Sequence, residues 1–217
     1  MDNDRRAGRL LSISSGSEHR SRQTELDSGV TGNARLTATT GVILFVLLGM
    51  EGITILRIRP LLSWHFFFGL LLIPPVVLKL ASTGYRFVHY YSGDRRYRTA
   101  GPPVTILRLI APAVVLSTVI VFITGVELWL YGGQLGPGWL RLHQLSFVVW
   151  FFATAVHVLG YLGRAPLLAA AEFRHEEKLA GARARQSVAV ASIITGLALA
   201  IATAQRISPF VVSHILR

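Results

Sequence analysis

The sequence predicts an all-α integral membrane protein with five transmembrane helices. Of its 217 residues, 52% are hydrophobic and only 15% are charged, and the mean hydropathy is +0.50. This composition is far more apolar than that of an ordinary soluble domain. Five apolar runs are long enough to cross a hydrocarbon layer of about 30 Å at about 1.5 Å per residue. They cover residues 36–56, 61–84, 104–131, 139–162 and 187–207.

The polar segments between and around these runs define the rest of the organisation. Residues 1–35 are rich in Ser, Gly, Arg and acidic residues without a hydrophobic period, and are expected to form a disordered cytoplasmic tail. Residues 36–162 form one membrane domain of four helices, and residues 163–186 form a cytoplasmic loop. The fifth transmembrane helix (187–207) is expected to be a packing or assembly element. A short C-terminal tail (208–217) follows it.

The net charge of +11 indicates membrane topology rather than nucleic-acid binding, because the basic residues lie in short clusters between the apolar runs. Most Arg and Lys residues fall in the N-terminal tail and in the connections after the second and fourth runs. The positive-inside rule then places the N-terminus in the cytoplasm and the C-terminus outside. We expect a multi-pass protein of a bacterial-type cytoplasmic membrane, with the lipid bilayer as its first partner.

The chain contains no cysteine. This excludes disulfides, thiolate zinc sites, thiolate-bound iron–sulfur clusters and c-type haem attachment. Any metal must therefore be held by histidine, by carboxylate or within a cofactor.

Ionisable residues inside the spans are the main functional signal, because burying such a group in lipid is costly unless it has a partner or a task. His143 and His157 are fourteen residues apart in the fourth run, and His65 and Lys79 show the same interval in the second run. At about 100° per residue, fourteen residues return to nearly the same helix face about 21 Å along the axis. Each stripe can therefore serve two sites, and Lys79 and His157 should match in depth near the inner face.

His65 and His143, the other two residues at this interval, are expected to meet near the outer face. His65 comes five residues after Pro60, and His143 five residues after Gly138. Two neutral imidazoles on facing helices are what axial ligation of a haem iron requires, and Gly69, four residues after His65, would let a porphyrin approach the backbone. The alternative is that both histidines pack between helices and bond to backbone or serine.

Two carboxylates lie near the outer ends of the first and third runs. Glu51 and Glu127 each lie near the outer end of one helix, and a histidine lies near the outer start of the next, so the two hairpins form a faint internal repeat. The ordinary interpretation is ion pairing or snorkelling near Arg57, Arg59 and Arg141. The alternative is proton relay for a quinone bound near the outer site.

These residues resemble the membrane-embedded di-haem b-type cytochrome subunits of formate dehydrogenases and nickel–iron hydrogenases. The resemblance covers residues 36–162 and rests on His65 in WHFFFG, His143 in RLHQLSF and His157 in ATAVHVLGYL. It implies a four-helix haem-binding bundle that holds haem b and passes electrons between a partner redox protein and the quinone pool. It also implies that His65 and His143 bind an outer haem and that His157 binds an inner one. Such a chain would be an electron-transfer subunit rather than a stand-alone enzyme, with no catalytic residue of its own.

The chain departs from the family pattern at the inner haem. Those subunits usually supply the second inner ligand from the first helix, where this chain reads NARLTATTG without a histidine. Lys79 could bind as a neutral amine or neutralise a haem propionate, and His89 is a reserve candidate. The sequence therefore leaves open whether the chain binds one haem or two. The rival prediction is a cofactor-free membrane scaffold or small transporter that uses the buried histidine, glutamate and lysine residues.

Overall fold

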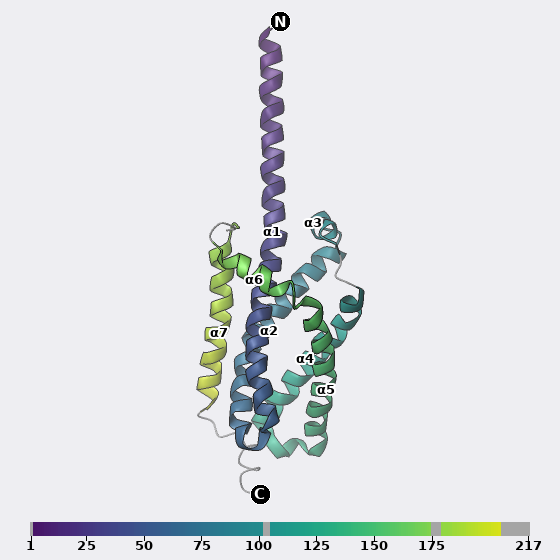
Figure 1. The fold of residues 1–217 in the computed structure, drawn as a ribbon, viewed down its shortest axis with the longest axis vertical. Coiled ribbons are helices and arrows are strands. Elements are labelled where there is room, and N and C mark those ends of the chain that lie inside the picture. Colours follow the sequence, from purple (N-terminus) through teal and green to yellow (C-terminus); the bar gives the residue numbers. More distant parts are fainter. Residues whose placement is uncertain (1, 102–104, 175–178, 205–217) are drawn as a thin grey trace.

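The computed structural model is all-helical and describes residues 2–101, 105–174 and 179–204, with side chains described from Ser28 onward except at Gly133. Figure 1 shows the helices in chain order. They are α1 (Asp2–Leu56), α2 (Ile58–Tyr91), α3 (Arg95–Thr99), α4 (Thr105–Tyr131), the 3-10 helix η1 (Gly132–Leu135), α5 (Pro137–Tyr161), α6 (Ala165–Phe173) and α7 (Ala182–Ala204).

Five helices are long and apolar enough to cross a membrane, which confirms the predicted number of spans. They are Ser28–Leu56, Ile58–Tyr91, Thr105–Tyr131, Pro137–Tyr161 and Ala182–Ala204. Many large apolar side chains on these helices are exposed, as Phe152, Leu159 and Ile194 illustrate. Such a surface is unfavourable in water and suited to lipid. The chain is therefore a multi-pass membrane protein.

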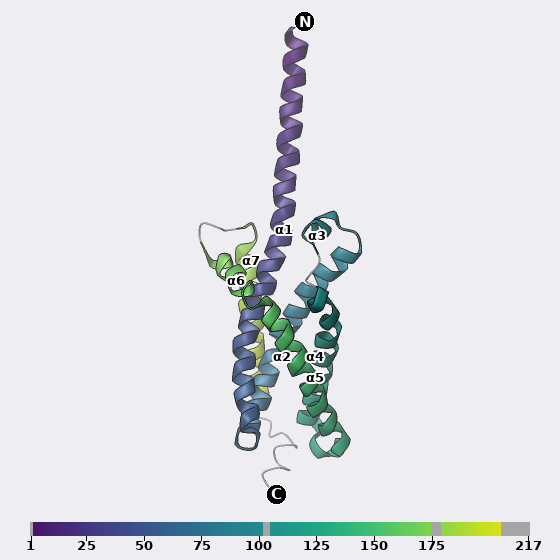
Figure 2. The same cartoon turned by 45° about the vertical axis from the view of Figure 1, so that its right-hand side comes forward.

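The spans are organised as two antiparallel hairpins with a fifth helix on one side. Helices α1 and α2 pack along each other, as do α4 and α5; α7 packs on α2, and α2 also contacts α4. We call the end where α1 turns into α2 and α4 into α5 the hairpin end, at the bottom of Figure 1, and the opposite end, with α3 and α6, the loop end. Figure 2 shows α2 leaning away from α1 toward α4 as it approaches the loop end.

The first span begins earlier than predicted. Asn33 donates to the carbonyl oxygen of Ser82 at 3.1 Å, and Arg35 donates to that of Ala171 at 2.8 Å, so these residues belong to the bundle rather than to a tail. Helix α1 is drawn from Asp2, and its first part extends beyond the bundle in Figure 1. The predicted disorder of that polar part stays a prediction. The predicted tail 208–217 lies outside the described residues.

Helix α7 docks where prolines interrupt the hydrogen bonding of α2. Pro75 has no N–H, so it cannot bond to the carbonyl four residues earlier, that of Leu71. Gly196 of α7 lies directly against this carbonyl oxygen, and a Cβ at that position would overlap it. Leu71 also belongs to a buried apolar cluster that joins α2 to α7, together with Leu70 and Ala200. The fifth helix is therefore part of the packed core.

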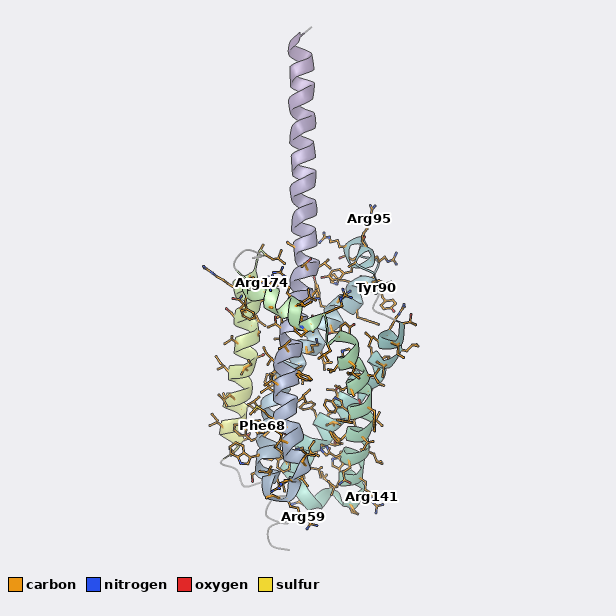
Figure 3. The ribbon with its side chains drawn as sticks, viewed as in Figure 1. Arg59, Phe68, Tyr90, Arg95, Arg141 and Arg174 are labelled. Atoms are coloured by element: carbon orange, nitrogen blue, oxygen red, sulfur yellow. The ribbon has the colours of Figure 1, made fainter. Side chains whose placement is uncertain are left out.

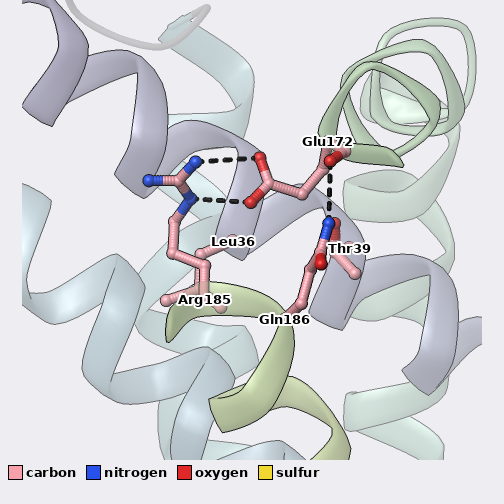
Figure 4. Close-up of a pocket in the computed structure, with 5 residues that line it drawn as sticks. All are labelled: Leu36, Thr39, Glu172, Arg185 and Gln186. Carbon is pink, nitrogen blue, oxygen red and sulfur yellow. Dashed lines mark hydrogen bonds and ion pairs between the residues drawn. The ribbon is translucent and has the colours of Figure 1, made fainter. Parts of the chain in front are cut away.

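The connection predicted as a loop over residues 163–186 contains a short helix, α6, that packs against α1. Pro166 in its first turn and the alanines that follow favour helix formation. Figure 4 shows how α6 is joined to α7: Arg185 bonds both carboxylate oxygens of Glu172, at 2.8 and 3.1 Å, and Gln186 donates to the backbone oxygen of Glu172 at 2.9 Å. Only 1% of the Glu172 side chain is exposed. This ion pair fixes the loop end.

Replacing Arg185 with alanine should lower the free energy of unfolding by about 3 kcal/mol, because it leaves the Glu172 carboxylate buried without its cation. Arg183→Ala is the matched control, since Arg183 is exposed on the same helix. SDS titration in mixed micelles measures both free energies. Equal values for the two variants would show that the ion pair contributes nothing specific.

Gly196→Val should separate α7 from α2 and lower the free energy of unfolding by about 1–3 kcal/mol, because the new side chain overlaps the Leu71 carbonyl. Gly49→Val provides the control, because nothing lies within 4 Å of a Cβ at that position. The same SDS titration compares them. A Gly196→Val protein as stable as Gly49→Val would contradict the close approach.

Candidate functional site

His65 and His143 lie side by side near the hairpin end of the bundle. Their ring centroids are 6.4 Å apart and the ring planes are nearly perpendicular, at 82°. His65 comes from α2 and His143 from α5, so the contact joins the two hairpins. The predicted match in depth between these two histidines is confirmed. Both side chains are partly buried.

The Nδ1 atom of His65 is held from the preceding helix. It lies 2.8 Å from Oε1 of Glu51 and 3.1 Å from the hydroxyl of Thr54, both in α1. The Thr54 hydroxyl donates to the backbone oxygen of Glu51 at 2.6 Å. We therefore assign the proton of the imidazole to Nδ1, donating to the carboxylate, which leaves Nε2 as a free lone pair. The prediction that Glu51 pairs with Arg57 or Arg59 was wrong, because its partner is His65.

His143 is held in a similar manner by a neutral group. Its Nδ1 lies 2.9 Å from the hydroxyl of Thr124 in α4, and this hydroxyl donates to the backbone oxygen of Ile120 at 2.7 Å. Nδ1 then donates to the Thr124 oxygen, and Nε2 again keeps its lone pair. Gly125 makes room for the ring, because a Cβ there would lie 3.2 Å from Cε1 of His143.

Two imidazoles are thus presented to each other with their Nδ1 atoms occupied. The side-chain contacts of both rings in the described residues involve Nδ1. A bond of about 2 Å from imidazole nitrogen to metal, with about 1 Å from nitrogen to ring centre, separates two axial rings by about 6 Å. The observed 6.4 Å is close to that separation. The spacing of the two rings therefore matches that of two imidazoles bound to one metal ion.

The second hairpin does not repeat the acid–histidine pair of the first. Oε2 of Glu127 is buried and has no hydrogen-bond partner among the described residues. No ion pair between Glu127 and Arg141 occurs in the described part of the chain, so the predicted pairing is not observed. Thr124 occupies the role that Glu51 and Thr54 share in the first hairpin. Both hairpins therefore place a glutamate and a histidine at corresponding positions, but the glutamate bonds to the histidine only in the first hairpin.

Lys79 and His157 lie toward the loop end at a second level. Nζ of Lys79 donates to the backbone oxygen of Thr37 in α1 at 2.6 Å. The ring of His157 lies 5.0 Å from that of Tyr161, and its buried Nδ1 has no hydrogen-bond partner in the described chain. No second histidine contacts His157 among these residues.

His89 lies farther toward the loop end, among tyrosines. Its ring centroid is 4.0 Å from that of Tyr85 and 5.3 Å from that of Tyr97.

In the described residues, no group of three or more His, Asp or Glu side chains is placed to hold a metal ion by itself. A metal at the His65–His143 pair would therefore need further ligands from a cofactor.

Thr54 and Thr124 are the site residues that sequence reasoning missed. Threonines are common in transmembrane helices, and most bond to a carbonyl one turn earlier, as Thr118 and Thr203 do here. Thr54 is three residues after Glu51, which places both on the same helix face. This spacing was a usable signal for Thr54, whereas nothing in the sequence near Thr124 singles it out.

No family model, curated protein or solved structure matches the chain. The resemblance to di-haem cytochrome subunits therefore stays an expectation from three histidine motifs. The contacts around His65 and His143 carry the functional inference.

The contact between Glu51 and His65 predicts an energetic coupling that its counterpart in the second hairpin lacks. A double-mutant cycle with Glu51→Gln and His65→Gln should give a coupling energy of about 1–3 kcal/mol in unfolding free energy. The cycle of Glu127→Gln and His143→Gln should give less than about 0.5 kcal/mol. Equal couplings in both hairpins, measured by SDS titration, would refute the assigned hydrogen bonds.

Proposed function

We propose that the chain is a membrane b-type cytochrome that carries electrons between a partner redox protein and the quinone pool. The observation that supports this most strongly is the pair of imidazoles, 6.4 Å apart, with Nδ1 atoms bonded and Nε2 atoms free. The apolar bundle around them suits a macrocycle, and the chain has no thiols that would favour another kind of redox centre.

His65 and His143 would hold the iron of haem b through Nε2, and the bound haem supplies reversible one-electron transfer. The protein fixes the two ligands. Glu51 and Thr54 keep the proton of His65 on Nδ1, and Thr124 does the same for His143, so both rings present the lone pair that a metal requires. Hydrogen bonding at Nδ1 also increases the basicity of the coordinating nitrogen.

The two ligands have unequal acceptors. His65 donates to a carboxylate, whereas His143 donates to a hydroxyl. A charged acceptor makes the stronger hydrogen bond and gives the ring more anionic character. His65 would therefore be the more strongly donating of the two residues that hold the iron.

For a second haem, His157 is the available histidine, and its second ligand stays open. Lys79 is bonded to the Thr37 carbonyl, which suits a cation that balances a propionate better than a neutral amine ligand. We assign Lys79 this charge-balancing role and propose that at least the His65–His143 haem is present. His89, among Tyr85 and Tyr97, is not assigned a ligand role.

We propose that the loop end faces the cytoplasm. Figure 3 shows Arg95 and Arg174 at this end and Arg59 and Arg141 at the hairpin end. The basic character of the loop end is increased by Arg86, Arg96 and Arg98 and by Arg183 at the start of α7, as the positive-inside rule requires. The hairpin-end histidine pair would then lie near the outer face.

A cofactor-free scaffold or small transporter is the second candidate. The contact of 2.8 Å between Glu51 and His65 favours it, because an acid–histidine pair inside a membrane is also a plausible proton-binding site. Haem in the purified protein distinguishes the two candidates. A transporter of this kind would be colourless.

The purified protein should show a Soret band and sharp α and β bands after reduction with dithionite. His65→Ala and His143→Ala should each remove one haem per chain by pyridine haemochrome assay, because each removes an axial ligand of the same iron. Gln144→Ala, at an exposed position next to His143, is the control and should keep full haem content. Complete absence of haem after expression with adequate haem supply would defeat the cytochrome proposal.

Lys79→Met should leave the haem content unchanged and lower the midpoint potential of the second haem, the one at His157. Removing a nearby positive charge favours the oxidised state of that haem. Redox titration followed optically measures this shift. Lys79→Arg, which keeps the charge, should restore the potential. Loss of haem in Lys79→Met would instead identify Lys79 as an iron ligand.

A further inference from the structure

A group of arginines surrounds the turn between α2 and α4 at the loop end. Arg108 lies with Cζ 5.4 Å from the ring centroid of Tyr91. Nη2 of Arg98 lies 3.8 Å from the position of a Cβ on Gly93, two residues farther along the turn. Arg86 donates to the backbone oxygen of Gly101 at 3.5 Å. We call Arg86, Arg95, Arg96, Arg98 and Arg108 the arginine patch.

The charge of this patch is not neutralised within the described chain. Asp94 is the acidic residue beside it, and its Oδ1 accepts from the backbone N–H of Arg96 as the cap of α3. No ion pair joins an arginine of the patch to a carboxylate in the part of the chain that the structure describes. Burial raises the pKa of the Tyr97 phenol, so this side chain stays neutral and adds no negative charge.

Large exposed apolar side chains lie on the same helices as Arg86 and Arg108. Phe87, Ile106 and Leu109 are exposed by 62%, 61% and 75%. Ile106 and Leu109 flank Arg108 in the first turns of the spanning helix Thr105–Tyr131. An anionic phospholipid has the matching arrangement, with a charged phosphate group at the membrane surface and an acyl chain that extends from it into the bilayer.

We propose that the arginine patch binds an anionic phospholipid, with its phosphate at Arg98 and Arg108 and an acyl chain along Ile106 and Leu109. Charge complementarity calls for an anion, and the depth of the site favours lipid over an acidic soluble protein. Arg108 is in the first turn of the helix Thr105–Tyr131, which is long and apolar enough to cross a membrane, and apolar residues follow it along this helix. The proposal does not depend on haem.

Native mass spectrometry of the full chain in detergent tests it, with phosphatidylglycerol and phosphatidylcholine as probes. The wild-type protein should bind phosphatidylglycerol more tightly. The double variant Arg98→Gln with Arg108→Gln should bind it about thirty-fold more weakly, since each surface cation contributes about 1 kcal/mol to anionic lipid binding. The control is Arg164→Gln with Arg183→Gln, which removes the same charge from exposed positions outside the patch and should bind normally. Circular dichroism verifies that each variant is helical.

A second pair of measurements separates a lipid from a free anion or an acidic protein partner. Leu109→Ser should weaken phosphatidylglycerol binding several-fold, and inorganic phosphate at equal concentration should not displace the lipid. Equal binding of both lipids, or an equal loss in the control variant, would overturn the proposal. Full displacement by inorganic phosphate together with an unaffected Leu109→Ser variant would also overturn it, because the patch would then recognise charge alone.

Discussion

Because the interior of a bilayer offers no water, each buried polar group of this chain needs a partner inside the protein. Several of the described side chains meet this constraint by pairing across helices. His65 bonds to Glu51 between α2 and α1, His143 bonds to Thr124 between α5 and α4, and Lys79 donates to a backbone carbonyl of α1. These bonds tie each hairpin together internally. The contact between the two histidines then joins one hairpin to the other.

The same constraint identifies where the protein is incomplete by itself. A buried polar atom without a partner costs about 1–3 kcal/mol, so such atoms indicate positions where water or a bound group would be favourable. Oε2 of Glu127 and Nδ1 of His157 are buried without a hydrogen bond in the described chain. Both lie in the second hairpin, and Thr37, Thr39 and His89 of the first hairpin also have such atoms, whereas both carboxylate oxygens of Glu51 are bonded. The two halves of the bundle therefore share positions and differ in chemistry.

The spans and the meeting of His65 with His143 could be predicted from sequence, because both follow from local properties. Apolar length sets a span, and equal distance from a helix start sets depth. The partners of the polar groups could not be predicted, because they depend on helix rotation. Glu51 was close in sequence to arginines and bonded to a histidine instead. The ion pair of Glu172 with Arg185 was hidden in a segment predicted as loop. Haem and electron transfer remain predictions.

Electron paramagnetic resonance of the oxidised, purified protein tests the central claim most directly. Two histidine ligands on one iron, with ring planes as nearly perpendicular as the 82° between His65 and His143, predict a low-spin ferric signal with a large maximal g value. Labelling histidine with ¹⁵N should alter the hyperfine coupling of this signal at two ring nitrogens, one from His65 and one from His143. A high-spin signal, or coupling to a single histidine nitrogen, would contradict joint ligation by His65 and His143.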